Sequence, residues 1–296
     1  MAADIKAQIK QSAKETESLL EELCRDTDKD LQTLFDSERY SLLGGGKRIR
    51  PFIVNETCRA LGGDVRVSAY YGAALEMIHT YSLIHDDLPC MDDDDMRRGK
   101  PTNHKVFGYS TALLAGDALL TKAFLVAASN PEGSAEQNAE AVRLIAEAAG
   151  ECGMIGGQII DLAGEHKLLD FETLLRLHRL KTGALIRCAA AMGAISAGYG
   201  RDTKEYGEAV AYADGVGLAF QVIDDILDAT GTEAELGKSV GSDAERGKTT
   251  FLSYFDVNEA SAYADKLTEN AVRSISAWQN AETLTELAYY LTNRKN

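Results

Sequence analysis

The stretch SLIHDDLPCMDDDDMRRGK (residues 82–100) joins an apolar helical pattern to a dense run of charges. Six aspartates fall within ten residues, and Arg97 and Arg98 follow them directly. A calcium EF-hand is excluded, because position twelve counted from Asp92 is Asn103, where such a loop needs glutamate. A charge run is usually a solvated loop, but the first aspartates sit in an apolar segment, where buried carboxylates need partners. Acids followed at once by bases therefore indicate a ligand with both cations and anionic oxygens, such as a diphosphate chelated by Mg²⁺.

A second acidic cluster lies in LAFQVIDDILD (218–228). On an ideal helix of about 100° per residue, Gln221 and the three aspartates of this segment share one arc, and its branched apolar residues occupy the rest. The simple alternative is the solvated face of an amphipathic helix. Adjacent carboxylates on one helix repel each other, however, and a Mg²⁺ ion with a phosphate ligand removes that repulsion. The segment is thus a candidate for a second cation site.

A glycine-rich basic segment, LLGGGKRIRP (42–51), precedes both clusters. Its glycines can expose backbone N–H groups, and its cations supply charge just before Pro51, as in an anion-binding loop at a helix start. It is not a Walker P-loop, because the G-x-x-x-x-G-K-[ST] pattern is absent. His79 lies two turns before Asp86 on nearly the same helix face, although a lone histidine is more often a satisfied core residue.

The rest of the chain predicts an all-α fold in one domain spanning residues 1–296. The four prolines all lie in the first 131 residues, and the segments between Gly- and Asp-rich turns are rich in helix formers. No Gly/Ser- or Pro-rich linker divides the chain. The apolar periodicity predicts helices over residues 4–24, 69–87, 110–128, 138–151, 171–194, 206–229, 258–276 and 281–292.

The formal net charge of −15 argues against nucleic acid or an anionic membrane surface as the main partner, because both need wide Lys/Arg-rich faces. No signal peptide is recognisable, and no run approaches about 18 uninterrupted apolar residues, so no integral membrane segment is expected. The five cysteines form no C-x-x-C pair, which suggests neither a zinc knuckle nor a disulfide framework. We expect a cytoplasmic enzyme.

The ordered set of motifs resembles the short-chain trans-polyprenyl diphosphate synthases, most closely the bacterial farnesyl diphosphate synthases. The resemblance implies an isoprenoid synthase fold, a large helical bundle around a deep central cavity, with the two aspartate motifs facing each other across its mouth and a homodimeric assembly. The motifs that carry it are GGKRIRP (45–51), DDLPCMDDDDMRRGKPTNHKVFG (86–108), LLAGDALL (113–120), GGQIIDL (156–162), KTGALI (181–186), FQVIDDILD (220–228) and LGKSVGSDAERGKTT (236–250).

The resemblance implies three Mg²⁺ ions in an active site that holds an allylic diphosphate. Asp86 and Asp92 would ligate two of these ions, and Asp224, supported by Asp225 and Asp228, would hold the third.

The resemblance also implies two diphosphate sites. Isopentenyl diphosphate would bind to Gly46, Lys47, Arg50, His79 and Arg98. The allylic diphosphate would bind to Arg97, Lys181, Lys238 and Lys248, with Thr182 and Gln221 near the developing cation. Asp86, Asp87, Asp92, Asp224, Lys181, Thr182 and Gln221 make up the implied catalytic set.

These residue types suit a prenyl transfer. Mg²⁺ and cationic side chains would stabilise departing pyrophosphate, leaving an allylic carbocation that isopentenyl diphosphate attacks. The resemblance implies that the released pyrophosphate takes the proton, and the sequence offers no dedicated His or Glu base that would contest this. Water would quench the cation, so apolar helix faces must keep the cavity dry.

In the resembling family, the residues four and five before the first aspartate motif limit product length, and here these are Ser82 and Tyr81. Tyr81 lies about 7.5 Å along the helix from Asp86, so a phenol ring there would stop growth near fifteen carbons. On an ideal wheel it points about 140° away from Asp86, which keeps an ordinary core tyrosine open as the alternative. We expect farnesyl diphosphate as the product, with geranylgeranyl diphosphate as the alternative.

Two other functions, those of a terpene cyclase and of a non-catalytic partner subunit, would leave different marks in the sequence. A terpene cyclase would carry a different second metal motif and lack the GGKRIRP segment. A non-catalytic partner subunit of a prenyl synthase tends to lose an aspartate motif or the basic residues, and this chain has both.

Overall fold

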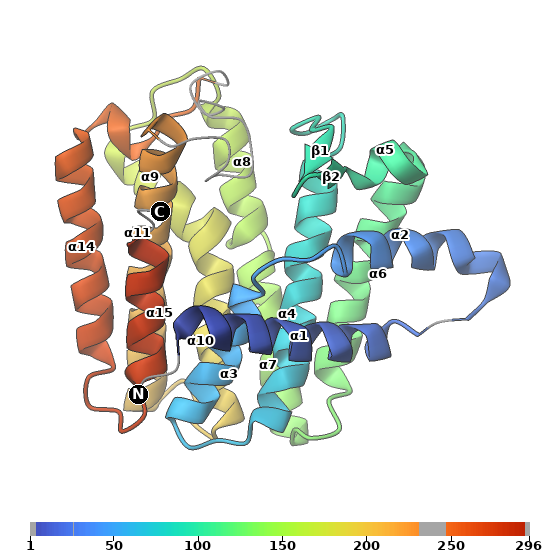
Figure 1. Ribbon diagram of the computed structural model, residues 1–296, viewed down its shortest axis with the longest axis horizontal. Coiled ribbons are helices and arrows are strands. Elements are labelled where there is room, and N and C mark those ends of the chain that lie inside the picture. Colours follow the sequence, from blue (N-terminus) through green and yellow to red (C-terminus); the bar gives the residue numbers. More distant parts are fainter. Residues whose placement is uncertain (1–3, 26, 231–246, 294–296) are drawn as a thin grey trace. The chain divides into compact units, whose positions relative to one another are not determined.

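The structure, a computed structural model, describes residues 4–25, 27–230 and 247–293. Helices make up nearly all the regular structure of these residues, and the exception is one short hairpin, so the all-α prediction is confirmed (Figure 1). In chain order the first elements are α1 (Ile5–Leu23), η1 (Lys29–Leu31), α2 (Gln32–Leu42), α3 (Ile49–Ala60), α4 (Val65–Asp86), β1 (Met96–Arg97), β2 (Lys100–Pro101), α5 (Asn103–Phe107), α6 (Tyr109–Ala128) and α7 (Ala135–Ala149). Then follow α8 (Met154–Gly164), α9 (Phe171–His178), η2 (Arg179–Gly183), α10 (Ala184–Ser196), α11 (Lys204–Thr230), η3 (Phe251–Ser253), α14 (Val257–Ser274) and α15 (Glu282–Thr292).

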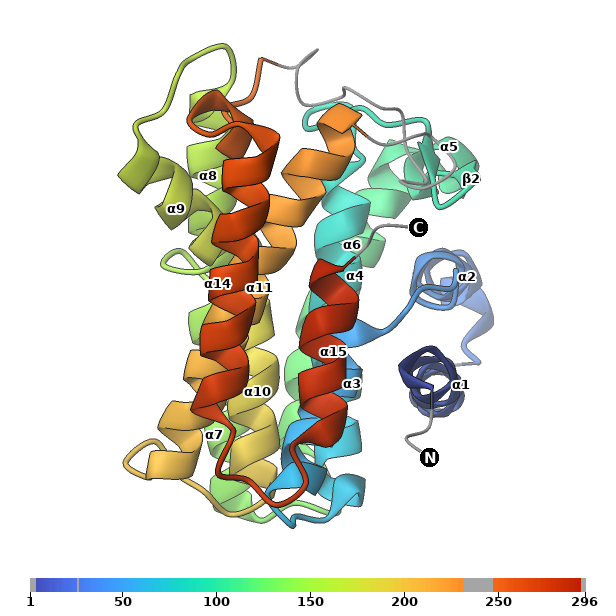
Figure 2. The ribbon, with the colours of Figure 1, turned by 60° about the vertical axis from the view of Figure 1, so that its left-hand side comes forward.

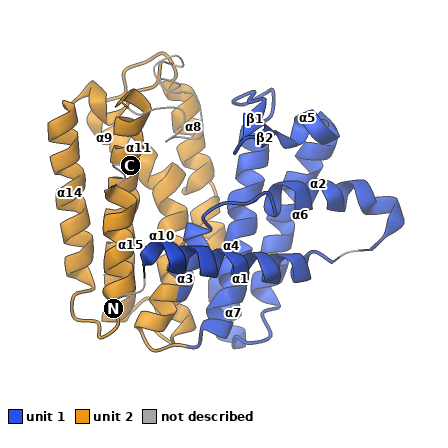
Figure 3. Cartoon of the chain, viewed as in Figure 1, with its two compact units in different colours: residues 1–55, 64–143 blue, residues 56–63, 144–296 orange. Residues whose placement is uncertain are grey.

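The chain forms two compact units, residues 1–55 with 64–143 and residues 56–63 with 144–296 (Figure 3). The prediction of a single domain over residues 1–296 stays a prediction.

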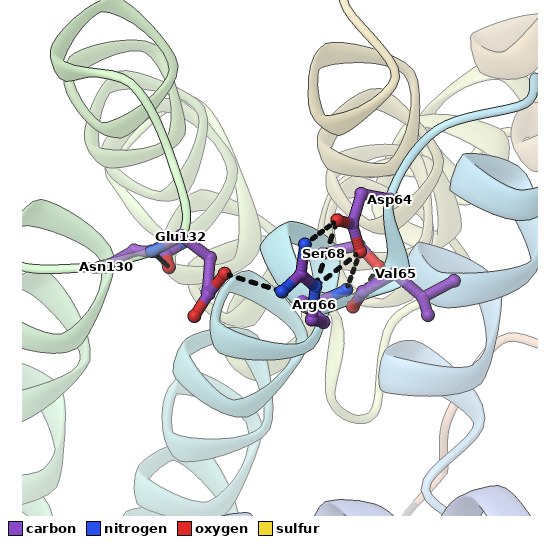
Figure 4. Close-up of polar contacts among 6 residues, drawn as sticks. All are labelled: Asp64, Val65, Arg66, Ser68, Asn130 and Glu132. Atoms are coloured by element: carbon purple, nitrogen blue, oxygen red, sulfur yellow. Dashed lines mark hydrogen bonds and ion pairs between the residues drawn. The ribbon is translucent and has the colours of Figure 1, made fainter.

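Helix α4 of the first unit begins at a capped N-terminus. The side chain of Asp64 accepts a hydrogen bond from the backbone N–H of Arg66 at 2.9 Å, which satisfies one of the free donors of the first turn. The Arg66 guanidinium bonds back to Asp64 and lies 3.7 Å from Glu132 in the connection between α6 and α7 (Figure 4). The start of α4 is thereby tied to that connection.

The core of the first unit is formed where α4 and α6 run side by side (Figure 1). The ring of His85 on α4 reaches α6 and lies 3.0 Å from the carbonyl oxygen of Leu113. A Cβ atom at Gly116 would collide with that ring, so a glycine is needed at this crossing.

The core of the second unit is centred on α11, which packs against α10 and α14 (Figure 2). The buried Tyr212 hydroxyl of α11 donates a hydrogen bond to the carbonyl of Leu284 in α15 at 2.6 Å. The sequence predicts one helix over residues 171–194, and the structure has α9 and α10 joined without a break by a π-helical turn, Arg179–Gly183. Such turns are frequent at functional sites.

Helix α6 is long and apolar enough to cross a membrane by length and composition, with a mean hydropathy of 1.5 over its best window. Within that window 39% of the residues are buried in the protein. One such helix is a weak indication of membrane insertion, because a core helix of a water-soluble protein passes the same test.

Candidate active site

The first aspartate motif starts at the C-terminal end of α4. Asp86 is the last residue of this helix, and its carbonyl oxygen accepts a hydrogen bond from the backbone N–H of Asp92 at 2.8 Å. The turn between them therefore folds Asp92 back onto Asp86. Both residues are half-buried, so the two predicted metal ligands of this motif lie together.

Asp87, next to Asp86, has a different environment. It is buried, and both of its carboxylate oxygens accept hydrogen bonds from Nε of Arg97, at 2.7 and 2.9 Å. Burial raises the pKa of Asp87, and the charge of Arg97 opposes that shift. Arg97 comes from β1, which pairs with β2 in a hairpin at this end of α4. The fork holds Arg97, a predicted allylic diphosphate ligand, in one orientation.

The glycine-rich loop before α3 contacts the neighbouring cation, Arg98. The Arg98 guanidinium donates a hydrogen bond to the carbonyl of Gly45, and a Cβ atom at Gly46 would lie 2.8 Å from Arg98 Nη1. Gly46 has φ +138°, so both its conformation and this close approach favour glycine.

His79 and Arg50 complete this cationic group with Arg98. The pKa of His79 lies well below its ordinary value, because the ring is buried and surrounded by arginines, Arg50 and Arg98 first among them. His79 is therefore neutral at pH 7 and offers one N–H donor. Lys47 is exposed on the same loop. The structure thus brings Gly46, Arg50, His79 and Arg98 together, and their role as an isopentenyl diphosphate site stays a prediction.

A pocket of about 430 Å³, open mouth included, lies in the first unit between α2, α4 and the hairpin. Asp87, Arg97 and Arg98 contribute to its wall, as do Tyr40 and Thr80. The two arginines that the sequence assigns to diphosphate binding therefore border an open space.

The second unit gathers its cations around Asp161. Oδ2 of Asp161 lies 2.6 Å from Nζ of Lys181 and 2.9 Å from Nζ of Lys248. Burial alone would raise the pKa of Asp161, but the two ammonium groups outweigh it and hold the pKa below its ordinary value. Lys181 and Lys248, both predicted allylic diphosphate ligands, are thus held side by side by one carboxylate.

Sequence reasoning missed Asp161. The signal was present in GGQIIDL (156–162), where an aspartate closes an apolar run. Gly157 of this segment lets α8 approach the π-helical turn, because a Cβ atom there would lie 2.6 Å from Lys181 Cα. The glycine and the aspartate together place the turn that carries Lys181 and Thr182.

The second aspartate motif lies near the C-terminal end of α11. Asp224 is half-buried, whereas Asp225 and Asp228 are buried. Oδ2 of Asp225 accepts a hydrogen bond from the backbone N–H of Phe251 at 2.8 Å and lies 3.8 Å from Nε2 of His178. Burial lowers the pKa of His178 to about 4, so its ring is neutral at pH 7. The role of Asp225 and Asp228 as metal ligands stays a prediction.

Two further predicted residues, Thr182 and Gln221, are half-buried in the second unit. Lys238 lies outside the described residues.

The donor set fits Mg²⁺. Across residues 4–25, 27–230 and 247–293, no group of three or more His, Cys, Asp or Glu side chains is arranged to hold a metal ion alone. Mg²⁺ usually takes only one or two protein carboxylates and completes its shell with water and substrate phosphates. Asp86 with Asp92 in the first unit, and Asp224 in the second, would supply such carboxylates.

Helical structure and two aspartate motifs, each with basic side chains in its own unit, fit the class of enzymes that handles prenyl diphosphates. The Polyprenyl synthetase family matches residues 32–288, and the chain belongs to this family of prenyltransferases. It is 44% identical to a geranylgeranyl diphosphate synthase of Cyanophora paradoxa over 266 residues, covering 89% of this chain and 88% of the relative.

A relative named as a farnesyl diphosphate synthase is equally similar to this chain. A farnesyl diphosphate synthase of Escherichia coli is 44% identical over 265 residues, covering 88% of both chains. A crystal structure of a FPP/GFPP synthase from Zymomonas mobilis superposes with a TM-score of 0.88 at 36% identity, covering 99% of this chain and 100% of that one. Similarity alone therefore leaves the two product lengths equally supported.

Proposed function

We propose that this prenyltransferase is a farnesyl diphosphate synthase. It would condense isopentenyl diphosphate with dimethylallyl diphosphate and then with geranyl diphosphate, head to tail, to give (2E,6E)-farnesyl diphosphate. The observation that carries the proposal is a bulky buried side chain, Tyr81, one and a half turns before Asp86 on α4. Geranylgeranyl diphosphate is the alternative product.

The residues of the first unit would do two tasks. Arg50, Arg98 and the neutral His79 would bind the diphosphate of isopentenyl diphosphate, and Lys47 would add charge from the exposed side of the loop. Arg97, held by Asp87, would bind the allylic diphosphate. Asp86, Asp92 and Asp224 would hold Mg²⁺, which would supply positive charge to the departing pyrophosphate.

The lysines of the second unit would stabilise a departing pyrophosphate. Lys181 and Lys248 are pre-positioned by Asp161, so little reorganisation is needed when negative charge develops. The allylic C–O bond breaks, the isopentenyl double bond attacks the allylic carbocation, and the released pyrophosphate takes the proton lost from the new chain. Thr182 and Gln221 would lie near the cation.

We infer the role of Tyr81 in limiting product length from its burial and from its place before Asp86 on α4. Its side chain is 5% exposed, and its ring packs edge-on against His85 with centroids 5.7 Å apart. Burial and the nearby charge of Asp86 raise the pKa of Tyr81 to about 12, so the phenol stays neutral. The hydroxyl has no hydrogen-bond partner among the described residues, which leaves the ring as a steric block. Neighbouring Ser82 donates a hydrogen bond to the carbonyl of His79 and is small.

The test of the product length is substitution of Tyr81. Tyr81→Ala should shift the products from fifteen to twenty or more carbons, measured by chromatography of the dephosphorylated alcohols. Tyr81→Phe keeps the ring and removes the hydroxyl, so it should leave the products unchanged. An unchanged distribution in Tyr81→Ala would remove Tyr81 as the limit.

A simpler assay distinguishes a prenyl diphosphate synthase from a terpene cyclase and from a non-catalytic partner subunit. Pyrophosphate release from dimethylallyl diphosphate should require both Mg²⁺ and isopentenyl diphosphate. Release that does not need isopentenyl diphosphate would favour a cyclase, and no release would favour a non-catalytic partner subunit.

We also infer a homodimer in the cytoplasm. Leu114 and Leu125 of α6 lie about three turns apart on one helix face and are 57% and 64% exposed. Exposed leucines on a helix this apolar suit burial against a second copy of the chain. Leu114→Lys combined with Leu125→Lys should convert a dimer to a monomer in analytical ultracentrifugation. A wild-type monomer would contradict this inference, and binding of the wild type to lipid vesicles would favour a membrane instead.

A further inference from the structure

Arg48 is the middle cation of the GGKRIRP segment, and it differs from its neighbours. Its side chain is 0% exposed, whereas Lys47 is exposed and Arg50 half-buried. A guanidinium that is closed off from solvent cannot meet a substrate that enters from solvent. The residue must therefore serve another purpose than direct diphosphate binding.

Three helices of the first unit converge on this guanidinium. Arg48 Nη1 lies 2.9 Å from Glu76 Oε1 on α4, and Nη2 donates to the carbonyl of Leu42 at the end of α2 at 2.6 Å. Nη2 also lies 3.2 Å from Glu17 Oε1 on α1. The planar fork of arginine can bond several acceptors in fixed directions at once, which the ammonium of lysine cannot reproduce.

The backbone of Arg48 also depends on these bonds. Its φ is +48°, in the left-handed region that a residue with a side chain enters at a cost. Such a conformation persists when surrounding contacts over-determine it. The bonds to Glu76, Leu42 and Glu17 supply those contacts, so they fix the path of the loop between α2 and α3.

Glu76, the α4 partner of Arg48, also acts on the neighbouring cations Arg50 and Arg98. It lies one turn before His79 on α4, and its side chain is 2% exposed. Its negative charge raises the pKa values of Arg50 and Arg98 against the larger lowering effect of burial. Glu76 Oε2 and Arg50 Nε have no hydrogen-bond partner among the described residues. One buried carboxylate thus offsets the repulsion among Arg48, Arg50 and Arg98.

We propose that Arg48 and Glu76 form a buried positioning pair that holds Lys47 and Arg50 ready for isopentenyl diphosphate. The inference rests on the proposed function, because it assigns those two cations to that substrate. Without the pair, the substrate would have to order the loop between α2 and α3 when it binds. The free energy spent on that ordering would weaken the binding of isopentenyl diphosphate. Neither residue needs to touch the substrate.

The test compares two variants that remove the pair in different ways. Arg48→Lys keeps the charge and loses the fork, and Glu76→Gln keeps the shape and loses the charge. Each should raise the KM for isopentenyl diphosphate about tenfold, the equivalent of one charge-assisted hydrogen bond. The KM for the allylic diphosphate should change by less than about twofold, since the Asp87–Arg97 fork is intact. KM reports on the folded fraction only, so partial unfolding of a variant does not obscure the result.

Matched controls lie on the same molecule. Arg66→Lys makes the same exchange in an exposed ion pair at the far end of α4, and should leave both KM values unchanged (Figure 4). Glu17→Gln removes the charge of the Arg48 partner that is 34% exposed, and it should change the KM for isopentenyl diphosphate by less than about twofold.

Three results would overturn the inference. An unchanged KM for isopentenyl diphosphate in Arg48→Lys would make Arg48 a stability residue only. A lower KM in Glu76→Gln would mean that the carboxylate only reduces the positive charge of the site. Equal rises for both substrates would indicate a general distortion. Failure of the proposed function itself would be seen differently, as a wild-type protein that forms no product from isopentenyl diphosphate.

Discussion

Asp87 and Arg97 form a two-pronged ion pair in which the guanidinium Nε contacts both carboxylate oxygens and Nη2 lies 2.6 Å from Oδ1. The carboxylate is 4% exposed and the guanidinium 32% exposed, so the pair has one closed side and one open side. The two adjacent aspartates of the motif therefore differ: Asp86 is half-buried at the end of α4, and Asp87 orients Arg97.

The first prediction concerns the different roles of Asp86 and Asp87. Asp87→Asn should raise the KM for the allylic diphosphate about tenfold, because Arg97 loses a charge-assisted fork. The Mg²⁺ concentration for half-maximal activity should stay the same, and initial rates at varied Mg²⁺ measure both quantities. A higher Mg²⁺ requirement in this variant would instead place Asp87 among the metal ligands.

The second prediction concerns the metal. Chelation with EDTA should abolish activity and added Mg²⁺ should restore it. Asp92→Asn should raise the Mg²⁺ concentration for half-maximal activity about tenfold, since it removes one of the carboxylates that Mg²⁺ prefers. Asp95→Asn is the matched control from the same acidic run, because Asp95 is 75% exposed and pairs with Lys105. Equal effects of the two substitutions would contradict a specific site at Asp92.

The third prediction concerns Asp161. Asp161→Asn leaves Lys181 and Lys248 to repel each other, so kcat should fall and the free energy of unfolding should drop by about 2 kcal/mol at pH 7. Steady-state kinetics and urea unfolding measure the two effects. Glu151→Gln, at an exposed position shortly before α8, serves as the control. Wild-type kcat in Asp161→Asn would contradict a role in placing the lysines.

The same residue predicts a pH dependence. The folded-state pKa of Asp161 is depressed below the ordinary 3.8, so its stabilising contribution is present above that value and is lost as the pH falls through the folded-state pKa. The difference in unfolding free energy between wild type and Asp161→Asn should therefore be constant from pH 7 to about 5 and shrink below about 4. A difference that grows toward acid would have the wrong sign for this ion pair.

The fourth prediction compares two helical glycines. Gly157→Ala must push α8 away from the π-helical turn, because its Cβ atom has no room beside Lys181. Gly207→Ala on α11 meets nothing within 4 Å and should stabilise the protein by about 1 kcal/mol. Thermal unfolding should therefore move in opposite directions, and only Gly157→Ala should reduce activity. Stabilisation by Gly157→Ala would contradict the close approach.

The sequence predicts most of the long helices, but its list of helical ranges misses α2, α3 and α8. The apolar periodicity of residues 69–87 and 110–128 corresponds to α4 and α6, because helical packing depends on spacing that the sequence displays directly. The grouping of Arg50, His79 and Arg98 also agrees with the motif-based prediction.

Pairings between distant residues could not be read in the same way. Asp161 and Lys248 are 87 positions apart, and no local pattern connects them. Three cations stand close together in GGKRIRP, and only the packing of α1, α2 and α4 decides that Arg48 is the buried one. The π-helical turn at Arg179–Gly183 interrupts a pattern that reads as one continuous helix.

The most direct test of the central claim is product analysis of the wild-type protein with isopentenyl diphosphate, Mg²⁺ and either dimethylallyl or geranyl diphosphate as separate starters. Both starters should give farnesyl diphosphate as the main product. A twenty-carbon main product from either starter would contradict the assignment of Tyr81 as the limit, and no prenyl product from either would contradict the proposed function.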